Sequence, residues 1–438
     1  MKNTPLNFET VEQVIKKSGI TKVGDASIRE IKKLVDDIEK ATGERFVRME
    51  MGIPGLPPLK IGVEAQKQAL DSGVAAIYPD IFGVQSLKTE IARFVKNFMD
   101  VDVSEDGCIP TVGSMQGSFA AFMTLNRMYK EREGTLFIDP GFPVHKQQLR
   151  VMGQGWESFD VYNYRGEKLR EKLESYLSTN RFCSLLYSNP NNPSWICFTD
   201  EELRIIGELA NRYNVIVIED LAYFAMDFRK DYSQPGVPPF QPTVAKYTDN
   251  FVLLISSSKA FSYAGERIGM MVVSDKLFKT KAPDLLRYYR SDLVGVALIY
   301  GTMYSLSSGT NHSSQYALAA ILKAANDGKF NFVEIVKEYG EKAKIMKRMF
   351  TDNGFKIVYD KDIDQPIADG FYFTFSYPGY SGADLLEELL YYGISAITLD
   401  ITGSERHEGI RACVSLVLRS QFPVLEQRLR TFHENHKN

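Results

Sequence analysis

The sequence has little of several features that mark specialised classes of protein. Only 4 cysteines and 5 histidines occur among its 438 residues, and the cysteines form no Cys-x-x-Cys pair. We therefore interpret the cysteines as reduced, packed thiols and expect no metal site. The formal net charge is −3, from 52 Lys plus Arg against 55 Asp plus Glu. So small a charge gives no strong field for binding nucleic acid, and no such partner is expected.

Long hydrophobic runs are also absent. The apolar stretches, such as 215–218 and 251–255, have the length of a strand, whereas a membrane-spanning helix requires about 20 residues. Residues 1–13 contain no apolar segment followed by small residues, the pattern of an export signal. We therefore expect no membrane partner and a location in the cytoplasm.

Between residues 60 and 310, short apolar runs alternate with amphipathic helical segments. This alternation predicts a parallel sheet covered by helices on both faces. A capping box that begins at Thr199 predicts a helix leading directly into the apolar run 215–218. That run ends in two carboxylates, Glu219 and Asp220, at the edge where open α/β sheets bind ligands. We expect an α/β protein with a mainly parallel central sheet.

The two ends of the chain predict a second, smaller domain. Residues 52–58 include three Pro and two Gly, which excludes a helix or a central strand. After residue 315, strands and helices follow one another in mixed order, which is typical of an α+β domain. We predict an N-terminal segment 1–59 that contributes to the small domain, a large cofactor-binding domain 60–315 and a C-terminal small domain 316–438.

The pattern that carries chemistry follows the apolar run 251–255. Ser256, Ser258 and Lys259 come directly after it, and Arg267 stands eight residues beyond the lysine. A lysine at the end of a buried strand loses part of its hydration, which favours the neutral amine needed for a Schiff base. The hydroxyls and the guanidinium are groups that bind phosphate. From these residues alone, an ordinary polar loop is an equally good interpretation.

This pattern resembles the cofactor signature of the fold type I pyridoxal 5′-phosphate (PLP) enzymes of the aspartate aminotransferase superfamily. Residues 189–193, Asn-Pro-Asn-Asn-Pro, are similar to the Asn-Pro-x-Asn-Pro-Thr-Gly motif of that family. The resemblance implies that Lys259 forms an internal aldimine with PLP. It also implies that Asp220 pairs with the pyridinium nitrogen, while Asn192 and Tyr223 bond the phenolate oxygen. An ionised Asp220 then keeps the ring nitrogen protonated, so that the ring accepts negative charge from the substrate.

The same resemblance covers roughly residues 45 to 425 and implies the rest of the site. The cofactor phosphate is expected to lie against Gly113, Ser114, Met115, Ser256, Ser258 and Arg267. Phe142 is expected to stack on the pyridine ring, and Tyr78 to reach the phosphate of a neighbouring subunit, which implies a homodimer. The substrate-binding residues implied are Gly52, Ile53, Asn192 and Arg411, the arginine through a bidentate pair with the α-carboxylate.

The sequence departs from the family at one place. Ser194-Trp195 stands where the family usually has Thr-Gly. A tryptophan in place of a glycine changes both the freedom of the backbone and the bulk beside the cofactor. We interpret this as the mark of a less typical branch; the departure bears on the substrate more than on the cofactor, and the amino donor stays open.

We predict a PLP-dependent aminotransferase (EC 2.6.1.-) that moves an amino group between an L-amino acid and a 2-oxo acid by a ping-pong mechanism. In it Lys259 is the general base and acid that moves a proton from Cα to C4′. Another PLP reaction, that of a C–S β-lyase or a decarboxylase, is an alternative because the cofactor motifs do not select which bond breaks. A non-enzymatic PLP-sensing regulator is a lesser alternative, since no basic cluster precedes the family region.

Overall fold

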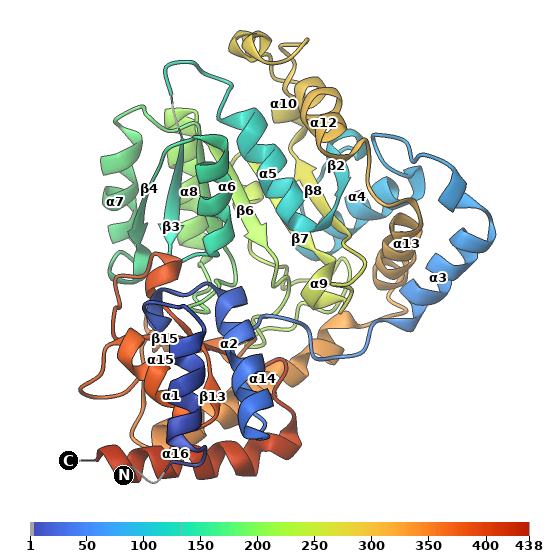
Figure 1. The fold of residues 1–438 in the computed structure, drawn as a ribbon. Helices are drawn as coiled ribbons and strands as arrows, with labels where there is room; N and C mark the ends of the chain where they lie inside the picture. The colour runs from blue at the N-terminus through green and yellow to red at the C-terminus, as the bar shows by residue number, and fades with distance from the viewer. Residues whose placement is uncertain (1–3, 133, 438) are drawn as a thin grey trace. The chain divides into compact units, whose positions relative to one another are not determined.

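The computed structural model describes residues 4–132 and 134–437, which form two compact units (Figure 1). What we call the small unit contains the chain up to Gly55, the short segment Asn192–Ile196 and the chain from Lys337 onward. What we call the large unit contains Leu56–Asn191 and Cys197–Val336. The small unit therefore takes in five residues from the middle of the sequence.

A seven-stranded sheet forms the centre of the large unit, in the order β2-β8-β7-β6-β5-β3-β4. Strands β4, β3, β5, β6 and β7 pair in parallel, whereas β8 runs antiparallel to both β7 and β2. This confirms the predicted α/β class with a mainly parallel sheet. The strands are β2 (Cys108–Thr111), β3 (Thr135–Asp139), β4 (Trp156–Asp160), β5 (Ser184–Ser188), β6 (Ile216–Leu221), β7 (Phe251–Ser256) and β8 (Gly269–Val273).

Helices surround this sheet. The capping box predicted at Thr199 is present, since its hydroxyl accepts the Glu202 N–H and the Glu202 carboxylate accepts the Thr199 N–H. The α-helices of the large unit are α3 (Lys60–Asp71), α4 (Gln85–Met99), α5 (Gly113–Leu125), α6 (Pro143–Met152), α7 (Lys168–Leu177), α8 (Asp200–Tyr213), α9 (Ser257–Ala260), α10 (Asp275–Phe278), α11 (Val294–Val296), α12 (Tyr304–Ser307) and α13 (His312–Asn326). A π-helix covers Ala297–Met303, and 3₁₀ turns cover Val74–Ala76, Glu105–Gly107, Val161–Asn163, Val244–Lys246 and Pro283–Arg287.

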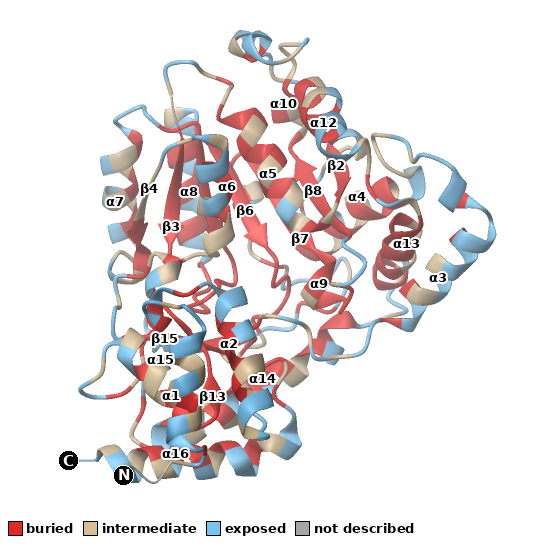
Figure 2. Ribbon diagram, viewed as in Figure 1, coloured by how far each residue is buried: buried red, intermediate tan, exposed pale blue. Residues whose placement is uncertain are grey.

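The hydrophobic core of the large unit lies between the sheet and α5. Ile218 of β6 and Leu254 of β7 cluster with Ala121 and Phe122 of α5, all almost fully buried. Figure 2 shows the central strands as buried along their length. Gly117 of α5 comes so close to β7 that an added Cβ would lie 3.0 Å from a Leu254 methyl carbon. Small residues on α5 therefore set how closely the helix packs on the sheet.

The small unit joins the two ends of the chain. Strand β1 (Val47–Arg48) pairs in parallel with β13 (Ile394–Ser395), and a four-stranded antiparallel sheet has the order β14-β15-β12-β9. The strands of this sheet are β9 (Lys356–Ile357), β12 (Tyr372–Ser376), β14 (Ile397–Thr398) and β15 (Ile410–Cys413). A separate antiparallel pair is formed by β10 (Lys361–Asp362) and β11 (Gln365–Pro366). The helices of the small unit are α1 (Phe8–Lys17), α2 (Ile28–Thr42), α15 (Gly382–Tyr391) and α16 (Phe422–His436), with 3₁₀ turns at Val23–Asp25, Asp400–Thr402 and Arg419–Gln421. Helix α14 (Phe332–Asp352) begins in the large unit and continues into the small one.

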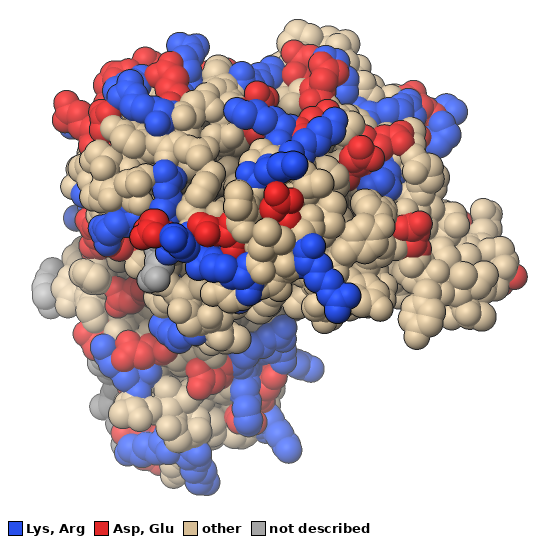
Figure 3. Space-filling view, turned by 90° about the horizontal axis from the view of Figure 1, so that it is seen from above, with Lys and Arg blue, Asp and Glu red and all other residues tan. Residues whose placement is uncertain are grey.

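The surface carries both signs of charge. In Figure 3 basic and acidic side chains are interspersed over the visible face, in line with the formal net charge of −3. Within the described residues, no helix is both long enough and apolar enough to cross a membrane. The same part of the chain holds no group of three or more His, Cys, Asp or Glu side chains placed to bind a metal ion.

The packing of β6 leads to a stability prediction. Ile218 is fully buried, so Ile218→Ala should lower the free energy of unfolding by about 2–5 kcal/mol through the lost contacts and the cavity. Urea unfolding followed by circular dichroism measures this change. Val151→Ala is the matched control, because Val151 lies on α6 with 69% of its surface exposed. Equal unfolding midpoints for the two variants would contradict the core described above.

Candidate active site

The candidate site of the large unit lies where β6 and β7 end. Asp220 is next to last in β6, and Lys259 lies in the single turn of α9 that follows β7. The Ser256 hydroxyl accepts the Ser258 N–H at 3.1 Å and so caps this turn. Because neighbouring parallel strands end at one edge of the sheet, the turn brings Lys259 close enough for its charge to act on Asp220.

Asp220 has almost no contact with solvent. One carboxylate oxygen accepts the Ala222 N–H at 3.1 Å. Burial raises the pKa of Asp220 to about 6, while the Ala222 N–H and the positive charge of Lys259 act to lower it. A cationic partner strongly stabilises the ionised form of a carboxylate buried in this way.

His145 is a neighbour of Asp220 that the sequence reasoning missed. Its Nε2 lies 3.8 Å from Asp220 Oδ2, and burial lowers the pKa of His145 to about 4. The imidazole is therefore neutral at pH 7 and does not compensate the carboxylate charge. The sequence did offer one signal for His145: it lies only three residues after Phe142, which was already expected in the site, and in the first turn of α6.

Tyr223 and Lys259 also come together. The Lys259 ammonium lies 5.8 Å from the centre of the Tyr223 ring, and Tyr223 is buried. Asp220, Tyr223 and Lys259 thus form one cluster in the large unit, with Lys259 half-buried beside it.

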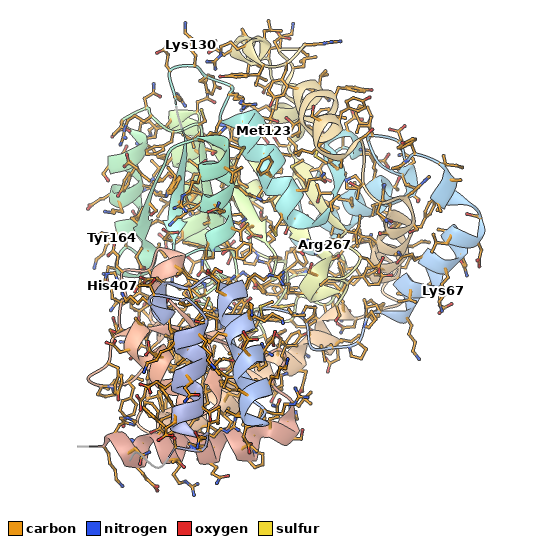
Figure 4. All side chains as sticks on the ribbon, in the orientation of Figure 1. Lys67, Met123, Lys130, Tyr164, Arg267 and His407 are labelled. Atoms are coloured by element: carbon orange, nitrogen blue, oxygen red, sulfur yellow. The ribbon has the colours of Figure 1, made fainter. Side chains whose placement is uncertain are left out.

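A second group of residues surrounds the first turn of α5. Gly113, Ser114 and Met115 open this 13-residue helix, whose unpaired N–H groups favour an anion. The Arg267 guanidinium lies against Gly113, where an added Cβ would be 2.5 Å from Nη2. Arg267 is among the residues marked in Figure 4, and its Nη1 donates to the Ala264 carbonyl at 2.9 Å. Helix N–H groups and a guanidinium so close together form a set of donors suited to a phosphate.

Phe142 and Tyr78 have different surroundings. Phe142 precedes α6 and packs edge-on against His145, with ring centres 5.6 Å apart. Tyr78 follows the turn Val74–Ala76 and has 89% of its surface exposed. The large unit by itself leaves Tyr78 outside the Asp220 cluster.

The expected substrate-binding residues lie in the small unit, around Arg411 of β15. Arg411 is buried; its Nη1 donates to Asn192 Oδ1 at 3.2 Å and its Nη2 to the Glu50 carbonyl at 2.6 Å. Its Nε is also buried and has no hydrogen-bond partner in the described part of the chain. The Tyr372 ring lies under the guanidinium, 4.4 Å from Cζ to the ring centre. Arg411 is thus held from two sides with N–H groups still available.

Gly52 and Ile53 border the same group. An added Cβ at Gly52 would lie 2.1 Å from the Tyr372 hydroxyl oxygen, so no larger residue fits there. Ile53 has 40% of its surface exposed, and its carbonyl accepts a hydrogen bond from the Ser415 hydroxyl. Gly52 and Ile53, at the start of the stretch rich in Pro and Gly, are therefore tied into the small unit.

Glu219, the other carboxylate of the pair that ends β6, has a separate environment. Successive strand residues point to opposite faces of a sheet, and the Glu219 carboxylate accepts hydrogen bonds from the Thr243 hydroxyl at 2.6 Å and the Val244 N–H at 3.2 Å. Burial raises the pKa of Glu219 to about 7. Glu219 therefore binds the loop after β6, a role that the sequence pattern did not distinguish from that of Asp220.

The raised pKa of Glu219 predicts how stability depends on pH. Between the ordinary value of 4.5 and about 7 the folded chain holds a proton that the unfolded chain has lost. The contribution of this group to stability is therefore full below the ordinary value and is lost as the pH rises through about 7. Comparing urea unfolding of wild type and Glu219→Gln at about pH 5 and about pH 8, we expect wild type to lose more stability than the variant. An equal loss in both proteins would contradict the assignment.

Comparisons with known proteins show which family the chain resembles. The family model described as aminotransferase class I and II matches residues 47–368. A probable aspartate aminotransferase of Methanocaldococcus jannaschii is 26% identical over 333 residues, which cover 75% of this chain and 77% of that protein. An aspartate aminotransferase of Pyrococcus horikoshii is 24% identical over 352 residues, 79% of this chain and 78% of that protein.

Solved structures show the same fold. The alanine aminotransferase from Pyrococcus furiosus superposes with a TM-score of 0.77 at 18% identity, covering 96% of this chain and 99% of that one. The aspartate aminotransferase of Thermotoga maritima gives a TM-score of 0.74 at 20% identity, with coverage of 96% and 99%. These similarities confirm the predicted fold type I architecture. With the family model matching well over half of its length, the chain belongs to the aminotransferase class I and II family, whose members depend on PLP.

Proposed function

We propose that this PLP-dependent aminotransferase exchanges an amino group between an L-amino acid and a 2-oxo acid at a site built on Asp220, Tyr223 and Lys259. The observation that carries the proposal is the convergence of a buried carboxylate, a phenol and a half-buried amine at the ends of β6 and β7. Such a set suits a cofactor that needs a carboxylate as counter-ion and an amine as proton-transfer group.

The residues of the large unit fit PLP. The N–H groups of the first α5 turn and the Arg267 guanidinium suit its phosphate, and an added Cβ at Gly113 would displace the guanidinium. The buried Asp220 carboxylate, whose pKa is raised to about 6, suits a protonated ring nitrogen. When bound, PLP withdraws electrons from the Cα of the attached amino acid.

The chain's own groups then have defined tasks. We propose that Lys259 Nζ takes the proton from the substrate Cα and returns it to C4′ of the cofactor. Asp220 holds its negative charge against the ring nitrogen, because a cation at that place stabilises the buried carboxylate. His145, whose Nε2 lies 3.8 Å from Asp220 Oδ2, is a neutral imidazole and so does not compete for that charge.

For the substrate we propose recognition of the α-carboxylate by Arg411. Its guanidinium is fixed by Asn192 and the Glu50 carbonyl, which leaves further N–H groups for a bidentate pair. Relatives named as aspartate and alanine aminotransferases make L-aspartate and L-alanine the first donors to test. We assign cofactor binding to residues 60–315, and Gly52, Ile53 and Arg411 to the segments 1–59 and 316–438.

We also propose that the active form is a cytoplasmic homodimer. Members of the family typically act as dimers. The 89% exposure of Tyr78 supports a role toward a second copy of the chain, since an isolated large unit gives its ring little to pack on. In that dimer Tyr78 contributes to the phosphate site of the partner.

Replacement of Lys259 tests the proposed function. Lys259→Ala should remove the visible absorbance of the lysine-bound cofactor and lower transamination by several orders of magnitude, because no other amine takes over the proton transfer. Spectra of the purified protein and single-turnover assays with L-aspartate and L-alanine measure both. Lys276→Ala, at an exposed lysine of α10, should leave both unchanged. Release of ammonia in place of amino transfer would point to the elimination alternative.

The phosphate site has its own test. Gly113→Ala places a Cβ 2.5 Å from Arg267 Nη2, so the guanidinium must move and PLP affinity should fall at least tenfold. Gly153→Ala is the matched control, because Gly153 has nearly the same backbone angle, φ +67 against φ +65, with nothing within 4 Å of an added Cβ. Equilibrium titration of the apoenzyme with PLP compares them. Equal affinity in the two variants would show that this turn does not bind the phosphate.

A further inference from the structure

Trp195 occupies a position that favours glycine. It has a left-handed backbone angle, φ 64, which side chains other than glycine adopt at a cost. The family usually has glycine there, yet this chain carries the largest of all side chains. Trp195 is also completely buried within the small unit. A gain in packing must therefore outweigh the backbone cost.

The packing partner on one side is a glycine. A Cβ added to Gly370 would lie 1.9 Å from Trp195 Cε2 and 2.1 Å from Cζ2, so the indole rests directly on the backbone at Gly370. On another side the indole meets the Tyr372 ring edge to face, with ring centres 6.2 Å apart and an interplanar angle of 64°. Both partners belong to the segment that enters β12.

These contacts lead to Arg411. The Tyr372 ring that meets Trp195 also lies under the Arg411 guanidinium, at 4.4 Å. Three residues before Trp195, the Asn192 side chain accepts the hydrogen bond from Arg411 Nη1. Trp195 thus contacts one of the groups that orient the guanidinium, the Tyr372 ring, and lies three residues along the chain from the other, Asn192.

We propose that Trp195 is a positioning residue that orients Arg411 for the carboxylate of the amino and oxo acid substrates. It fixes the Tyr372 ring below the guanidinium and anchors Asn192 beside it. The inference rests on the proposed role of Arg411 in substrate binding. The bulk that replaces the family's glycine is then part of carboxylate recognition in this chain and acts without touching the substrate.

Trp195→Gly tests this, because glycine suits the backbone angle and only the indole is lost. We expect KM for L-aspartate or L-alanine, whichever wild type uses, to rise about tenfold, equivalent to about 1.4 kcal/mol of binding. The visible absorbance of bound PLP should stay the same and kcat should change much less than KM. Trp195→Phe, which keeps an aromatic ring, should restore part of the affinity. The affinity for acetate, measured through the cofactor absorbance, compares carboxylate binding in wild type and the Trp195 variants without turnover.

Gly370→Ala completes the test as a double-mutant cycle. Alone, its Cβ collides with the indole, so it should raise KM as Trp195→Gly does. In the double variant with Trp195→Gly, Gly370→Ala should raise KM little further, because the indole with which its Cβ collides is absent. Unchanged KM in Trp195→Gly, additive effects in the double variant, or loss of bound PLP would overturn the inference. Wild type that fails to transaminate while acetate binding still weakens in the variant would instead reject the proposed function alone.

Discussion

The large unit depends on one electrostatic constraint, the burial of the Asp220 carboxylate at the end of β6. Burial raises its pKa to about 6, and only the Ala222 N–H and the charge of Lys259 oppose that shift. His145, the side chain placed next to it, is neutral. The folded chain therefore keeps a negative charge that is incompletely compensated until a cation lies beside it. A protonated pyridine ring would meet that requirement, in line with the role proposed for Asp220.

The small unit holds the opposite charge under similar conditions. Arg411 is buried even more deeply than Asp220, and its guanidinium is oriented by an amide, a carbonyl and an aromatic face. A cation fixed in this way binds a planar carboxylate with little loss of side-chain entropy. The large unit thus holds a buried anion, Asp220, and the small unit holds a buried cation, Arg411.

Local patterns in the sequence predicted much of the fold. The apolar runs 215–218 and 251–255 correspond to β6 and β7, and the capping box at Thr199 begins α8 as expected. The order of the strands and the reversed direction of β8 were not accessible in this way. Strand β8 runs antiparallel between β7 and β2, and nothing in its apolar sequence distinguishes it from a parallel strand, because pairing joins residues far apart in the chain.

The sequence by itself determined the family and the cofactor, because the motifs around residues 189–193, 220–223 and 256–267 are short and keep their spacing. Tertiary structure alone decided how the surrounding groups act. It placed His145 against Asp220, turned Glu219 to the other face of the sheet, and set Trp195 on Gly370. Such contacts depend on which surfaces meet after folding, and a local pattern carries no record of a partner that lies many residues away.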